Sequence, residues 1–319
     1  MMPNGTRKHK IKAEKERGNT MAKNAKCLKC GAVITDTTAA TAIKTTCGIQ
    51  YYCAACADRI FEMRRYGYST ENAIRKSKPT ADNFTISKEF EIPVAITRVL
   101  PLPEIKKLLC TMDHLGWLPT SDCTVYVECK SPIYNGLQSY NKVSKTISEL
   151  AKVTSWANDN SYGTHTNIGH TDFDDAKMDI LRRWRETLLT PLQDYMIQHE
   201  YKTVAIFSRP VADWCGRLGS DWTNHSAFIN LQHSTWVEFR INKYTSYEQD
   251  SYATKVCIAL FAEMLKFAKA IQANRATYTG AKLAEVNRAT AIKYAAKLVK
   301  VFEKMYADKY ETTAASVRA

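Results

Sequence analysis

Apolar and polar residues alternate along four short stretches of the chain, which predicts four β-strands with one apolar and one polar face each. In the first stretch, Phe90 and Ile92 alternate with Glu89 and Glu91. The four stretches are 84–93, 121–132, 162–170 and 235–241. We expect the apolar faces to pack into one core and the polar faces to share the other side of a sheet.

Longer stretches repeat their apolar residues about every 3.6 positions, which predicts helices. They cover 101–116, 136–157, 172–200, 250–273 and 281–310. A short apolar run, 203–207, is predicted to be a strand that ends at Ser208-Arg209-Pro210. Three arginines in the third helix, Arg182, Arg183 and Arg185, are expected to form a solvated face. The chain is therefore predicted to be an α+β protein whose antiparallel sheet is backed by helices.

The polar face of each predicted strand carries side chains that bind cations or anions. In chain order they are Glu89, Glu91, Glu128, His165, Asn167, Glu238 and Arg240. Neighbouring carboxylates repel each other unless a cation or a base lies between them. Taken alone, Glu89 and Glu91 are equally compatible with a solvated edge strand, and Glu238 with Arg240 is most simply a solvated ion pair. Four such faces in one chain favour a shared site.

Two C-x2-C pairs near the N-terminus predict a zinc module. The ligands would be Cys27, Cys30, Cys53 and Cys56, whose two pairs are separated by 22 residues. Four thiolates at this spacing suit one tetrahedral Zn²⁺, and the order of knuckle, hairpin and pair at a helix start is typical of a zinc ribbon or treble clef. Cys47 is a less favoured substitute ligand. A site with four thiolates has no open position, so we expect a structural or docking role.

Composition and charge divide the chain further. Residues 1–26 carry eight Lys or Arg against two Glu, a charge of +6 with few apolar residues, which predicts a disordered basic tail. We expect the zinc module at 27–66, a polar linker at 67–83, the main domain at 84–275 and a basic helix at 276–319. A basic tail either contacts nucleic acid or only aids solubility.

The sequence has no apolar run long enough to span a bilayer and no apolar segment behind its basic N-terminus. We therefore expect a cytoplasmic protein without a membrane partner, whose ten cysteines stay reduced. Carboxylates combined with one imidazole suit Mg²⁺ or Mn²⁺, and an arginine beside them suits a phosphate. No P-loop or G-x-G-x-x-G turn is present. The pattern predicts ATP chemistry on an antiparallel sheet.

Several of these segments, in this order, resemble the amidoligase family, a distant relative of glutamine synthetase and the glutamate–cysteine ligases. The segments are E-F-E, D-x5-E-x-x-S-P, G-x-H-x-N, and R-P followed by H-S-A-F-I-N-L and T-W-V-E-F-R. The resemblance covers roughly residues 84–275. It implies a glutamine-synthetase-like catalytic sheet and a ligase that uses ATP to activate a carboxylate as an acyl phosphate, which an amine then attacks.

The resemblance also implies roles for individual residues. Glu89, His165 and Glu238 would hold the metal that bridges the ATP phosphates, and Glu91 and Glu128 a metal nearer the acceptor. Arg240 would stabilise the transferring phosphoryl group, with Arg209 as a second phosphate or substrate contact.

Two departures from the family pattern stand out. Asn167 replaces the second histidine of H-x-H and would hydrogen-bond a phosphate or the substrate; Ser87-Lys88 replaces the glycine that usually precedes the glutamates. The alternative function is a zinc-containing protein that binds nucleic acid or another protein. The sequence does not identify the carboxylate substrate or the amine substrate, and it does not indicate the oligomeric state.

Overall fold

The computed structural model describes residues 33, 40–45, 48–53, 82–92, 102–120, 127–154, 163–209 and 227–317. The predicted tail, the linker up to residue 81 and three of the four zinc-ligand cysteines lie outside these residues. Within them, strands β1 (Ala40–Thr45) and β2 (Gly48–Cys53) form an antiparallel hairpin. A hairpin between the two cysteine pairs is what the spacing predicts, and Cys53 is the last residue of β2.

The main sheet is antiparallel and follows the order β4-β5-β3-β7-β9-β8, with β6 pairing with β3 as well. Its strands are β3 (Phe84–Ile92), β4 (Leu118–Thr120), β5 (Val127–Lys130), β6 (Tyr134–Asn135), β7 (Gly163–His170), β8 (Ile229–Asn230) and β9 (Trp236–Lys243). The α+β class with a mainly antiparallel sheet is therefore confirmed. The four predicted strands are β3, β5, β7 and β9, and all four are consecutive in the centre of the sheet.

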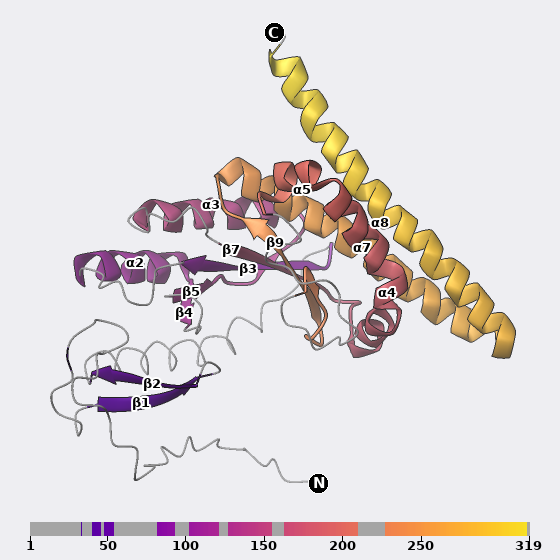
Figure 1. Ribbon diagram of the computed structural model, residues 1–319, viewed down its shortest axis with the longest axis horizontal. Helices are drawn as coiled ribbons and strands as arrows, with labels where there is room; N and C mark the ends of the chain where they lie inside the picture. The colour runs from indigo at the N-terminus through magenta and orange to yellow at the C-terminus, as the bar shows by residue number, and fades with distance from the viewer. Residues whose placement is uncertain are drawn as a thin grey trace.

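Helices cover one face of this sheet, where the apolar sides of the strands lie (Figure 1). The helices of the described residues are α2 (Leu102–Leu115), α3 (Ser139–Val153), α4 (Asp175–Gln198), α5 (Glu200–Phe207), α7 (Tyr247–Thr277) and α8 (Gly280–Val317). Helices α3 and α7 contact the strands, and α8 packs on α4 and α7. The α7 N-terminus is fixed by Ser246, whose side chain accepts a hydrogen bond from the Gln249 N–H.

The predicted strand at 203–207 is wrong, because these residues belong to α5. Four consecutive apolar residues, Val204 to Phe207, do not distinguish a buried strand from a helix segment. Here α4 ends at Gln198 and the chain turns into α5 one residue later. Thr203, Ile206 and Phe207 are then buried at helical spacing. Ser208 closes α5 in the left-handed conformation, with φ 58°.

A lysine and an aspartate form an ion pair inside the core, between the sheet and α7. Lys88 lies on the apolar face of β3, and its Nζ is 2.8 Å from Asp250 Oδ1, with both side chains fully buried. The Asp250 carboxylate also accepts hydrogen bonds from Ser144 of α3 at 2.6 Å and Asn242 of β9 at 2.7 Å. Thr164 of β7 lies 3.4 Å away. One carboxylate thus joins three strands to two helices.

Asn242 reaches this carboxylate because β9 contains a β-bulge. Thr166 pairs with Phe239 and Thr164 pairs with Asn242. A step of two residues along β7 therefore corresponds to a step of three residues along β9. The extra residue returns Asn242 to the helix face, which simple alternation from Phe239 would not do. Arg240 precedes this change of register and stays on the polar face with Glu238, to which it donates a hydrogen bond.

Replacing Lys88 should destabilise the fold strongly, because Asp250 would remain charged and buried without its cation. Lys88→Met is expected to lower the free energy of unfolding by about 3–5 kcal/mol. Adding Asp250→Asn should restore part of that loss, since a neutral amide still contacts Ser144. Urea unfolding measures both effects, with Lys145→Met on the exposed face of α3 as the control. Equal stability of Lys88→Met and the control would contradict a stabilising role for this pair.

Candidate functional site

The register of four strands brings the predicted polar side chains together on the face of the sheet opposite α7. In β3, Glu89 pairs with His165 of β7 on one side and with Lys130 of β5 on the other. Glu91 pairs with Glu128 of β5. On the far side of β7, Asn167 pairs with Glu238 of β9. Residues separated by up to 76 positions in the sequence, as Glu89 and His165 are, thus become cross-strand neighbours.

The imidazole of His165 lies at the centre of this group. Its Nδ1 is 3.2 Å from Glu89 Oε2 and 3.1 Å from Glu238 Oε1. Its Nε2 is 3.4 Å from Glu91 Oε1 but has no hydrogen bond, although it is buried. Only 1% of the His165 side chain is exposed. The ring is therefore enclosed by three carboxylates, and its Nε2 has no hydrogen-bond partner.

Glu238 is the most fully hydrogen-bonded carboxylate of the site. Oε1 accepts from Arg240 at 2.8 Å, and Oε2 accepts from Asn230 at 2.6 Å and lies 3.2 Å from His233 Nε2. His165 completes the set. A carboxylate has about four lone-pair positions, and here each has a neighbour. A metal ion at Glu238 would have to replace one of these donors.

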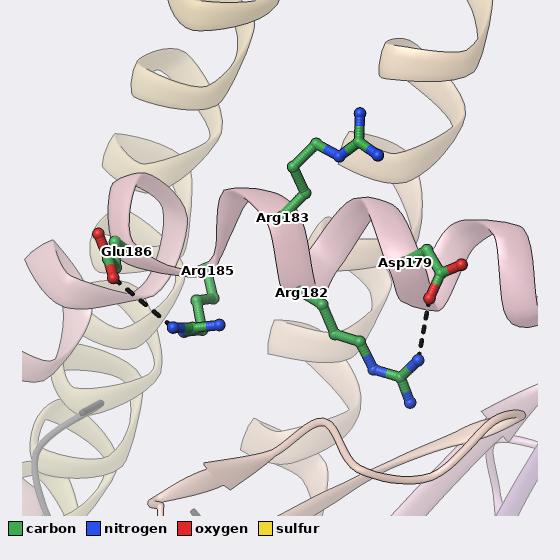
Figure 2. A pocket seen from close by; sticks show the side chains of 5 residues that line it. All are labelled: Asp179, Arg182, Arg183, Arg185 and Glu186. Atoms are coloured by element: carbon green, nitrogen blue, oxygen red, sulfur yellow. Dashed lines mark hydrogen bonds and ion pairs between the residues drawn. The ribbon is translucent and has the colours of Figure 1, made fainter. Parts of the chain in front are cut away.

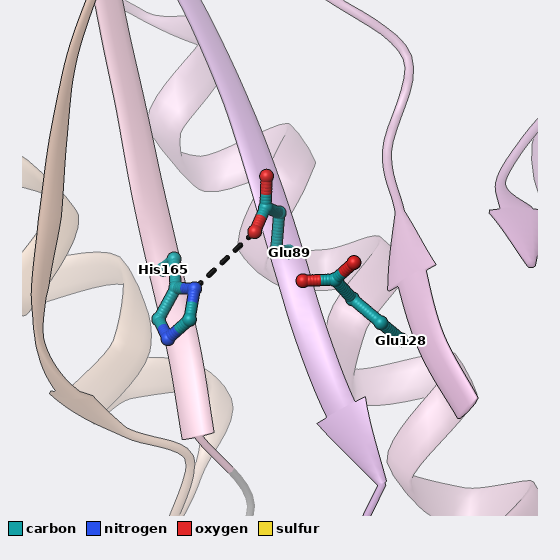
Figure 3. A group of neighbouring side chains, drawn as sticks. All are labelled: Glu89, Glu128 and His165. Atoms are coloured by element: carbon teal, nitrogen blue, oxygen red, sulfur yellow. Dashed lines mark hydrogen bonds and ion pairs between the residues drawn. The ribbon is translucent and has the colours of Figure 1, made fainter. Parts of the chain in front are cut away.

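Glu89, Glu128 and His165 form the tightest group of candidate metal ligands among the described residues. Each offers one donor atom, and these atoms lie within 4.8 Å of one another. Figure 3 shows the three side chains on adjacent strands, with the Glu128 carboxylate pointing toward Glu89. Lys130 Nζ lies between the two carboxylates, 3.5 Å from Glu89 and 3.4 Å from Glu128. In the ion-free protein this ammonium partly neutralises the pair.

The electrostatics of the site follow from enclosing carboxylates with a base. Burial favours neutral imidazole, but hydrogen bonds with Glu238 and Glu89 outweigh it and raise the pKa of His165 to about 9. For Glu89, burial opposes ionisation, yet the His165 contact and the Lys130 charge hold its pKa well below the usual range. The Glu238 pKa is lowered in the same way, against burial, by His165, His233 and Arg240. At neutral pH His165 is thus an imidazolium among ionised carboxylates.

Gly163 makes room for Glu91 at the first position of β7. A Cβ atom placed there would lie 2.0 Å from Glu91 Oε2 and 3.5 Å from Arg209 Nη1. Arg209 donates a hydrogen bond to the Arg240 carbonyl at 3.3 Å. The predicted second arginine is therefore at the Glu91 end of the site, beside β9. The missing side chain at Gly163 allows a carboxylate and a guanidinium to approach the same point.

Asn167 also belongs to this group. Its amide Nδ2 donates to Glu89 Oε1 at 3.2 Å, while its Oδ1 is buried without a hydrogen-bond partner. As an amide it cannot replace a second histidine in charge or in nitrogen ligation. It can orient Glu89 and still offer one oxygen to a further donor or cation.

Three residues of the site were not predicted from the sequence: Lys130, Asn230 and His233. The spacing of Lys130, two residues after Glu128, placed it on the polar face of the same strand and was a usable signal. Asn230 and His233 enter through the β8–β9 pairing, in which Asn230 lies opposite Glu238. His233 lies in the connecting loop and stacks on Trp236, with ring centroids 4.5 Å apart. Loop residues carry no periodic signal, so only the fold places them.

No family model matches the chain, and no curated protein matches it. None of the helices in the described parts of the chain is long and apolar enough to cross a membrane. The zinc site stays a prediction, since Cys27, Cys30 and Cys56 lie outside the described residues.

The pH dependence of stability should report the His165 network in protein freed of metal ions. Because the folded pKa of His165 is about 9 and its reference value is 6.5, its contribution is full below about pH 6.5 and is lost as the pH rises through 9. Glu89 and Glu238 act oppositely: their contribution is present above about pH 4.5 and is lost as the pH falls. Urea unfolding from pH 4 to 10 should show this window. His165→Gln should remove the alkaline decline; an unchanged decline would assign it to other groups.

Gly163→Ala should disturb the site without unfolding the protein. The new methyl group would meet the mobile end of Glu91, which can turn away at little cost in stability. We expect Mn²⁺ binding to weaken several-fold while the melting temperature changes by a few degrees at most. Gly169→Ala is the comparison on the same strand, because its methyl group would crowd Thr85 and the Thr235 carbonyl instead of Glu91. Equal Mn²⁺ affinity in both variants would show that Glu91 is not needed for binding.

Proposed function

We propose that the protein is an ATP-dependent ligase that joins a carboxylate to an amine through an acyl phosphate. The observation that carries this proposal is the convergence of Glu89, Glu128 and His165 on one sheet face, with Arg240 hydrogen-bonded beside them. These residues come from four strands and in the order that resembles the amidoligases. The glutamine-synthetase-like topology of the sheet is part of the proposal.

The donor set fits a hard divalent cation such as Mg²⁺ or Mn²⁺. The three donor atoms within 4.8 Å are two carboxylate oxygens and one imidazole nitrogen, and the second carboxylate pair, Glu91 with Glu128, is adjacent. The buried Nε2 of His165 has no hydrogen bond, and it could bind a cation once the cation has displaced the proton of the imidazolium. Carboxylate oxygens are the preferred ligands of these ions, with imidazole more common for Mn²⁺ than for Mg²⁺. A bound cation would supply positive charge that neutralises the ATP phosphates.

The chain's own cations would hold the transferring phosphate. Arg240 is oriented by Glu238, so its guanidinium is fixed before any ligand binds. Arg209 lies at the Glu91 end of the same face, and Lys130 lies between Glu89 and Glu128. Charges that are already oriented stabilise a developing phosphoryl charge without a reorganisation cost at the moment of reaction. In this proposal Arg240 stabilises the charge of the transferring phosphoryl group. Arg209 contacts a phosphate or the carboxylate substrate.

The remaining assignments are proposed with the same function. Glu91 and Glu128 would serve a cation nearer the acceptor, and Asn167 would hydrogen-bond a phosphate or the substrate. Four thiolates in the N-terminal module would hold a structural Zn²⁺. The identity of the acceptor amine is left open: it could belong to a peptide, a polyamine, a cell-wall fragment or a protein side chain. Binding of nucleic acid or protein by the tail and the zinc module is compatible with this activity, since such a module could deliver the ligase to its substrate.

Binding of ATP with Mg²⁺ tests the proposal directly. We expect purified protein to bind a non-hydrolysable ATP analogue only with Mg²⁺ or Mn²⁺, as measured by calorimetry, and to release ADP from ATP when a substrate pair is supplied. Glu89→Gln and Arg240→Gln should each reduce ADP release by about 100-fold or more, because each removes an oriented charge. Glu149→Gln, which removes an exposed ion pair with Lys152, is the control. Absence of metal-dependent binding by the unmodified protein, or equal ADP release by all variants, would exclude an ATP-dependent ligase.

A further inference from the structure

Arg182 reaches from α4 to the loop between β8 and β9, which carries His233. Its Nε donates to the Leu231 carbonyl at 2.8 Å, and its Nη2 donates to the carbonyls of Gln232 at 3.1 Å and His233 at 3.0 Å. The predicted solvated face is therefore wrong for Arg182, whose side chain is 21% exposed. The sequence could not show this, because the three carbonyl partners lie about 50 positions away in a loop without a motif.

Arg182 is itself held in place on α4. Its Nη1 donates to Asp179 at 2.9 Å, one helical turn earlier. Both residues line an open depression on α4, together with Arg183, Arg185 and Glu186. Figure 2 shows the Arg182 guanidinium directed toward the strand connection and Arg183 directed away from it. A planar guanidinium with five donors can bind three consecutive carbonyls at once, which a lysine ammonium cannot match in geometry.

The loop that Arg182 holds determines the surroundings of Glu238. The His233 ring stacks on Trp236, and its Nε2 lies 3.2 Å from Glu238 Oε2. Asn230 Oδ1 accepts a hydrogen bond from the Gln232 N–H at 2.9 Å, which turns its amide nitrogen toward the same carboxylate oxygen. Both donors to Glu238 Oε2 thus depend on the path of residues 231–233. Glu238 Oε1 is left for Arg240 and His165.

We infer that Arg182 is a positioning residue of the candidate site and acts through His233 on Glu238. By fixing three carbonyls of the loop, it sets the His233 imidazole against one oxygen of Glu238, so that the other oxygen orients Arg240 and His165. This inference rests on the proposed function for its effect on ATP, but the structural link from Arg182 to His233 can be measured without any ligand.

The ligand-free test is NMR of the histidine side chains in the metal-free protein at one fixed pH. The chain has seven histidines, and the His233 signals can be assigned by their loss in His233→Gln. We expect Arg182→Ala and Arg182→Lys to shift the His233 ring resonances, because the loop carbonyls lose some or all of their donors. Arg183→Ala, on the same helix and exposed, should leave them unchanged. Unchanged His233 resonances in both Arg182 variants would overturn the inference.

The second test is a double-mutant cycle on binding of Mn²⁺ with an ATP analogue. Arg182→Ala and His233→Ala should each weaken binding by about tenfold, as is usual for residues that orient a ligand or an anion-binding group. The double variant should lose no more than His233→Ala alone, because both changes break the same link. Arg183→Ala should bind like the wild type. Arg182→Lys keeps the charge and provides a folded alternative if Arg182→Ala is unstable, and it should show an intermediate loss.

The outcomes of these tests distinguish failure of the inference about Arg182 from failure of the proposed ligase function. Additive losses in the double variant, or Arg182 variants that bind like Arg183→Ala, would show that Arg182 does not act through His233 while leaving the ligase proposal intact. If the wild type does not bind the metal–ATP analogue at all, the proposed function fails, and the NMR comparison alone decides whether Arg182 positions His233.

Discussion

The fully buried pair of Lys88 and Asp250 is the constraint on which the arrangement of the sheet depends. Each charge would be costly in an apolar core without the other, so the two residues can be buried only together. The Asp250 carboxylate also accepts hydrogen bonds from Ser144 and Asn242, which extends the constraint to α3 and β9. Any slip of β3, β7 or β9 would leave a charge or a hydrogen-bond donor unpaired. The network therefore stabilises the core. It also favours the observed strand register over registers shifted by one or two residues.

That register is what assembles the polar face. Lys88 and Thr164 point into the core, and their sequence neighbours Glu89 and His165 point to the other side and meet as a cross-strand pair. The bulge in β9 lets Asn242 join the core network while Arg240 remains beside Glu238. A slip of one residue would exchange the two faces and separate the carboxylates from His165. The buried ion pair and the candidate site therefore lie on opposite faces of the same paired strands, and both depend on the same register.

The site is balanced electrostatically in a way that suits an exchangeable cation. Four carboxyl groups, those of Glu89, Glu91, Glu128 and Glu238, share this face with four cations, Arg209, Arg240, Lys130 and the protonated His165, so the two kinds of group are equal in number. Burial alone would neutralise some of these acids, but the hydrogen bonds of His165 keep Glu89 and Glu238 ionised. A divalent ion that entered here would compete with the proton of His165 and with Lys130. Arg182, through the loop at 231–233, adds a fixed donor to Glu238 from outside the sheet.

The sequence by itself determined the four main strands, the polarity of their faces and most residues of the polar face that forms the candidate site, because alternation specifies which side chains share a face. It also determined five of the helices through their apolar period. It did not determine α5, since a run of four apolar residues fits a strand or a helix. Only the tertiary structure decided the burial of Lys88, the bulge that turns Asn242 inward, and the approach of Asn230, His233 and Arg182 to Glu238. These depend on strand pairing and on loop carbonyls, which are long-range contacts that no local pattern encodes.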